Sequence, residues 1–183
     1  MRIKKPKRQG AFDGACGFYA VHNALSLLYP NVVGEDDFST LLGALSKNAV
    51  PKQFFSGTGR NELNRMLGHI LDDDRFSPTS VRRPWWTGGV VPLKDFWARL
   101  GDHLGQERSA AIVMVGHEPT PDNTFNHWTV VRKVTDRSLL LHDSDGLGRI
   151  PRLRSRVRDG KESHAARPYS IDHTATFLLR REV

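Results

Sequence analysis

Three side chains that could together carry out nucleophilic catalysis are widely spaced along the chain: Cys16, His127 and Asp143. A cysteine attacks a carbonyl carbon as its thiolate, a histidine accepts and returns the proton, and an acid orients the histidine and stabilises its cation. Cys16 is the only cysteine, so no internal disulfide can form. These residue types indicate acyl transfer, provided that the fold brings them together.

Cys16 lies where a helix is expected to begin. Apolar side chains recur at helical spacing within residues 17–29, at Val21, Ala24, Leu25 and Leu28. The N-terminal end of a helix carries a partial positive charge, which favours the thiolate over the thiol. Because Ala15 and Gly17 flank Cys16 and are small, we expect the sulfur to be exposed in a cleft.

His127 begins one predicted strand, and Asp143 follows the end of the next. The strands span residues 128–134 and 138–142, with a turn at Asp136 and Arg137 between them. Antiparallel pairing of these strands would bring His127 close to Asp143. Asp145 is a rival for the same role, but the glycine after it indicates a turn, so we assign Asp145 a structural role.

The segment from Gln9 to Ala24, Gln-Gly-Ala-Phe-Asp-Gly-Ala-Cys-Gly-Phe-Tyr-Ala-Val-His-Asn-Ala, resembles the papain-like superfamily of cysteine peptidases. Its Gln…Cys-Gly-x-x-Ala pattern is similar to peptidases that process double-glycine bacteriocin leaders, and its Asp-Gly-x-Cys to ovarian-tumour-type deubiquitinases. The resemblance implies a thiol protease with a papain-like fold, in which Cys16 is the nucleophile and His127 the base. It also implies that Asp143 orients His127 and that Gln9 contributes to the oxyanion hole.

Helical patterns precede strand patterns along the chain. Besides 17–29, helices are expected at 38–45, 58–70 and 93–104, and strands at 110–115, 128–134, 138–142 and 174–179. The intervening stretch 77–92 indicates an irregular loop whose Trp85 and Trp86 either line a cleft or pack onto the body. We therefore expect one α+β domain over residues 1–183, with N-terminal helices packed on a C-terminal antiparallel sheet.

The chain has a net charge of +7 and a pI of about 9.9, with basic runs near residues 4–8 and 149–161. A non-catalytic nucleic-acid-binding module, with Trp85, Trp86 and Trp97 stacking on bases, is the alternative function that this charge suggests. Both runs lack apolar periodicity, as solvated segments do, so we expect a protein or peptide substrate instead of nucleic acid.

No apolar run is long enough to cross a bilayer, and no apolar segment follows the basic N-terminus as in a signal peptide. We expect a cytoplasmic protein in the producing cell, or one exported without such a signal. Bacterial toxins and effectors of this superfamily are similar in size and charge.

His117, His127, His142 and Asp143 are the candidate metal ligands, but their spacing matches no metal-binding motif, and we expect neither a metal nor a cofactor. The residues leave four reactions open: peptide cleavage, isopeptide cleavage, deamidation of glutamine and transamidation. All four use the same thiolate, base and oxyanion hole.

Overall fold

The computed structural model describes residues 5–7, 15–34, 36–43, 57–120, 123–158 and 167–182. These residues form helices and a mainly antiparallel sheet, which confirms the predicted α+β class. The helices are α1 (Cys16–Leu28), α2 (Asp36–Gly43), α4 (Arg60–Leu71) and α5 (Leu93–Leu104). Each lies within two residues of the predicted boundaries, because an apolar stripe at helical spacing marks all four segments in the sequence.

The sheet contains seven strands in the order β1-β7-β2-β3-β4-β5, with β6 paired to β7 outside this path. All pairs are antiparallel except β6 with β7. The strands are β1 (Thr79–Arg82), β2 (Ser109–Thr120), β3 (Asn123–Val134), β4 (Ser138–Leu141), β5 (Arg149–Pro151), β6 (Ser155–Val157) and β7 (Tyr169–Arg181).

Three of these strands were not predicted, and the expectation that residues 77–92 are irregular throughout is wrong, because β1 lies within them. Strands β1 and β5 lie at the two ends of the sheet order, and β5 and β6 have only three residues each. Such strands are defined by main-chain pairing along one edge. Their side chains therefore show little of the apolar alternation that identifies a buried strand.

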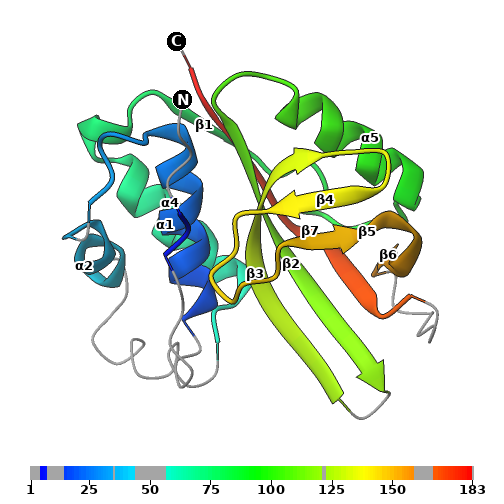
Figure 1. Cartoon of the computed structure of the whole chain (residues 1–183). Coiled ribbons are helices and arrows are strands. Elements are labelled where there is room, and N and C mark those ends of the chain that lie inside the picture. The colour runs from blue at the N-terminus through cyan, green and yellow to red at the C-terminus, as the bar shows by residue number, and fades with distance from the viewer. Residues whose placement is uncertain are drawn as a thin grey trace.

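Helices cover both faces of the sheet. Figure 1 shows α1, α2 and α4 gathered on one side of the long strands and α5 on the other. Ala110 and Ile112 of β2 belong to the core under α1, whereas Ala111 and Val113 alternate with them and pack into the core under α5. The central strands are buried on both faces, which makes them a rigid base for residues at their ends.

Among the described residues, no helix is both long and apolar enough to pass through a bilayer.

Candidate active site

Cys16 is the first residue of α1. Ala15, which precedes it, provides no side-chain cap, and the first turn of the helix contains no acidic residue. The partial positive charge of the helix end is therefore not offset by a capping carboxylate in that turn. The prediction that Cys16 is exposed is wrong: the residue is buried, with 8% of its surface exposed.

Thr58 packs against the residue after Cys16 and connects α1 to the sheet. A Cβ atom on Gly17 would lie only 2.6 Å from the Cβ of Thr58, so the close approach requires glycine after Cys16. The indole Nε1 of Trp128 donates a hydrogen bond of 2.6 Å to the carbonyl oxygen of Thr58. Thr58 thus contacts the neighbours of both Cys16 and His127, and it holds the start of α1 against β3.

His127 and Asp143 form a buried pair. The Nε2 of His127 donates to the Oδ1 of Asp143 at 2.7 Å, and the two side chains are 3% and 1% exposed. The other carboxylate oxygen, Oδ2, accepts hydrogen bonds from the backbone N–H groups of Asp145 at 2.9 Å and Leu147 at 3.0 Å. Both oxygens of Asp143 therefore have donors, which locks the orientation of the carboxylate.

The third member of this group is Cys16, whose side chain interacts with the imidazole of His127 and helps to raise the pKa of the histidine. Because Nε2 is engaged by Asp143, Nδ1 is the nitrogen left for the sulfur. A hydrogen bond to an acid on one nitrogen and to a thiol on the other is the arrangement in which histidine exchanges a proton with a nucleophile.

The charges in this group favour a protonated histidine. Burial alone would lower the pKa of His127, but the hydrogen bonds to Asp143 and Cys16 and the negative charges of both outweigh it and raise the pKa to about 9. Burial would raise the pKa of Asp143, yet the hydrogen bond and charge of His127 and the N–H of Leu147 lower it. His127 and Asp143 thus suit an imidazolium and a carboxylate.

Asp145 lies in the turn after Asp143, and its backbone N–H donates to Asp143, the residue that is hydrogen-bonded to His127. Gly146, which follows, has a φ of +84°, a conformation that glycine adopts without strain. The side chain of Asp145 is exposed and borders a pocket of about 210 Å³ beside His127.

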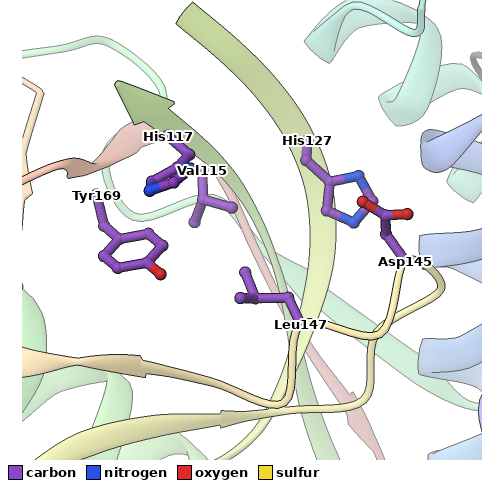
Figure 2. Close-up of a pocket in the computed structure, with 6 residues that line it drawn as sticks. All are labelled: Val115, His117, His127, Asp145, Leu147 and Tyr169. Atoms are coloured by element: carbon purple, nitrogen blue, oxygen red, sulfur yellow. The ribbon is translucent and has the colours of Figure 1, made fainter. Parts of the chain in front are cut away.

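The pocket is mainly apolar (Figure 2). Val115 and Leu147 line it together with Tyr169, whose ring stacks on His117 with 4.7 Å between centroids. Sequence reasoning missed Leu147 and Tyr169. Tyr169 reaches the pocket because β7 pairs with β2 in the register that places Tyr169 opposite His117, and β7 begins five residues before the predicted strand.

Three further residues singled out from the sequence are Gln9, Trp85 and Trp86. Gln9 lies outside the described residues. Trp85 packs against Phe96 with 4.9 Å between ring centroids, and Trp86 packs against Phe177 at 5.8 Å. Both tryptophans therefore pack the 77–92 segment onto the body and do not line the pocket beside His127.

His117 and His142, the other two candidate metal ligands, make contacts that do not bring a third ligand to the His127–Asp143 pair. His117 stacks on Tyr169, and the Nε2 of His142 lies 3.4 Å from the hydroxyl of Ser26 on α1. Burial and the nearby positive charge of Arg132 lower the pKa of His142 to about 4, so His142 is neutral near pH 7. Within the described part of the chain, no three His, Cys, Asp or Glu side chains gather as metal ligands would.

Comparison with protein-family models gives no match for this chain, and comparison with curated proteins gives no significantly similar sequence.

The titration of His127 should reveal the buried group directly. We expect its imidazole resonances in a histidine-labelled sample to titrate with a midpoint near pH 9, with Asp143→Asn lowering that midpoint. Because this pKa lies above the ordinary value of 6.5, the protonated histidine stabilises the fold fully below pH 6.5, and the contribution is lost as the pH rises through about 9. His142, with a pKa of about 4, serves as the internal reference. A wild-type midpoint at or below 6.5 would contradict the assignment.

Proposed function

We propose that this protein is a papain-like cysteine hydrolase that cleaves peptide or isopeptide bonds. The observation that carries the proposal is the buried His127, which is hydrogen-bonded to Asp143 on one side and to Cys16 on the other. A merely structural histidine needs one partner to satisfy each nitrogen, but it does not need a thiol at a helix start and a carboxylate locked by two further N–H groups.

In the proposed reaction the Cys16 thiolate attacks the carbonyl carbon of the substrate. The tetrahedral oxyanion is stabilised by the backbone N–H of Cys16, at the positive end of α1, and by the side-chain amide of Gln9. His127 then donates its proton to the leaving amine, and a C–N bond breaks to give a thioester on Cys16. Water, deprotonated by His127, hydrolyses the thioester and releases the acid, while Asp143 keeps the imidazole oriented throughout.

The pocket beside His127 favours cleavage of a peptide or isopeptide over deamidation. Because His127 protonates the leaving nitrogen, groups next to His127 contact the leaving part of the substrate. Deamidation releases only ammonia, which needs no apolar pocket. A pocket of about 210 Å³ lined by Val115, Leu147 and Tyr169 suits a leaving group that carries an apolar chain, such as a side chain of the peptide or the stem of a lysine.

Incubation of the wild-type protein with a cell lysate, followed by mass spectrometry of the lysate proteins, tests the activity. We expect new peptide termini or released lysine amines with the wild type and none with Cys16→Ala, because the alanine cannot form the acyl-enzyme. A mass gain of about one unit on glutamine would instead identify a deamidase, and new cross-links a transamidase. Identical lysates with the two proteins would rule out covalent catalysis by Cys16 on these substrates.

The roles of the two neighbouring aspartates can be separated on the substrate found in this way. Asp143→Asn should lower kcat by on the order of 10³–10⁴-fold, because an amide neither favours the required tautomer nor stabilises the imidazolium. Asp145→Asn is the matched control and should keep kcat within a few-fold, because the support of Asp143 by residue 145 comes from its backbone N–H. Full activity of Asp143→Asn with a collapse of Asp145→Asn would assign the orienting role to Asp145.

A further inference from the structure

A second hollow lies at the opposite end of β4 from Asp143, and its lining is strongly basic. Its volume is about 550 Å³. Three arginines line it, together with one carboxylate, two small residues and a leucine: Arg137, Arg149, Arg152, Asp136, Ser138, Pro151 and Leu153. We call this the basic groove. None of the three residues of the proposed triad belongs to it.

The arginines of the basic groove differ from those surface arginines that pair with a carboxylate. Elsewhere in the described residues, Arg75 pairs with Asp37 and Asp73, and Arg65 pairs with Glu62. Within the same described part of the chain, Arg137, Arg149 and Arg152 form no ion pair, although Asp136 is near them. Positive charge is therefore concentrated here without compensation, which attracts anionic ligands.

Leu153 gives the basic groove an exposed apolar side chain in addition to its charges. Its side chain is 86% exposed, one of the few large apolar residues that the described surface leaves in water. It lies at the centre of a single 3₁₀ turn, Arg152–Arg154, between two arginines. Leu153 adds an apolar contact point to the arginine-lined hollow, which suits a partner that presents an apolar side chain among negative charges.

The groove is held in a defined shape by contacts beneath it. The backbone N–H of Arg152 donates to the carbonyl of Arg137 at 2.8 Å, and the hydroxyl of Ser155 donates to the carbonyl of Arg152 at 2.9 Å. The guanidinium of Arg152 lies over the ring of Trp97, 5.5 Å from its centre. Because these groups are already ordered, a ligand would lose less conformational freedom on the protein side when it binds.

We propose that the basic groove binds an acidic polypeptide segment that carries an apolar residue, with Arg137 and Arg149 contacting carboxylates and Leu153 contacting the apolar side chain. This interaction is separate from the proposed hydrolysis and requires none of the triad residues. A nucleic acid fits less well: Trp97, the aromatic residue of this region, is 4% exposed under Arg152 and presents no face for base stacking.

The test measures fluorescence anisotropy of labelled probes with the full-length Cys16→Ala protein, so that no probe is cleaved. The probes are a short peptide of glutamates around a central leucine, the same peptide with glutamine for every glutamate, and oligothymidine. We expect the glutamate peptide to bind and the glutamine peptide not to bind. The double variant Arg137→Ala, Arg149→Ala should weaken binding by about tenfold.

Two controls exclude a general charge effect. The double variant Arg65→Ala, Arg180→Ala removes the same charge from arginines that pair with Glu62 and Glu182, and it should bind the glutamate peptide as tightly as the parent does. Leu153→Ser should weaken binding of the leucine peptide several-fold, but not that of a glutamate peptide with glutamine at the centre.

Equal binding of the glutamate and glutamine peptides, or no binding of either, would overturn the proposal. Equal losses in the two arginine double variants would show that overall charge, not the groove, attracts the peptide. Tighter binding of oligothymidine, lost with Arg137→Ala, Arg149→Ala, would assign the groove to nucleic acid and would also overturn it.

Discussion

The hydrogen bond of 2.7 Å between His127 and Asp143 is the interaction on which the rest of the site depends. Both side chains are almost completely buried, and a charged imidazole or carboxylate in such a place is stable only with a partner of opposite charge. Each group also uses its remaining bonding capacity. Asp143 accepts two backbone N–H groups, and His127 bonds to Cys16. Removal of any one of the three would leave a buried polar group without its partner.

The fold supplies this arrangement from elements far apart in the sequence. Helix α1 brings Cys16, strand β3 brings His127, and the turn after β4 brings Asp143. The pairing of β3 with β4 sets the distance between the histidine and the acid. Thr58, held by Trp128 and packed against Gly17, then sets the distance between α1 and β3. Cys16 and His127 therefore lie on regular elements, and Asp143 lies in a turn whose backbone N–H groups hold its carboxylate.

Much of this could be predicted from the sequence, because it follows from periodicity and chain direction. The apolar stripe of α1 is a local pattern that predicts a helix beginning near Cys16. The short turn between β3 and β4 is another local pattern, and it predicts that His127 lies near Asp143. The burial of Cys16 was not predictable, because local periodicity does not show which distant segments pack around the start of α1. Thr58, for example, packs on Gly17 and lies 42 residues from Cys16 in the sequence. Tyr169 and the strands β1, β5 and β6 were missed for a related reason. Main-chain pairing between distant segments positions them, and their side chains show no apolar pattern from which the strands could be predicted.

The reactivity of the Cys16 sulfur tests the central claim, that Cys16 and His127 act as a thiolate and imidazolium pair, most directly. The measurement is the rate of alkylation by iodoacetamide below neutral pH, where an ordinary cysteine thiol, with a pKa of about 8.5, is almost entirely protonated. We predict that the wild-type protein reacts faster than a free thiol of ordinary pKa under these conditions, and that His127→Ala reduces the rate at least tenfold. Equal rates in the two folded proteins, or a wild-type rate no higher than that of the free thiol, would contradict the account.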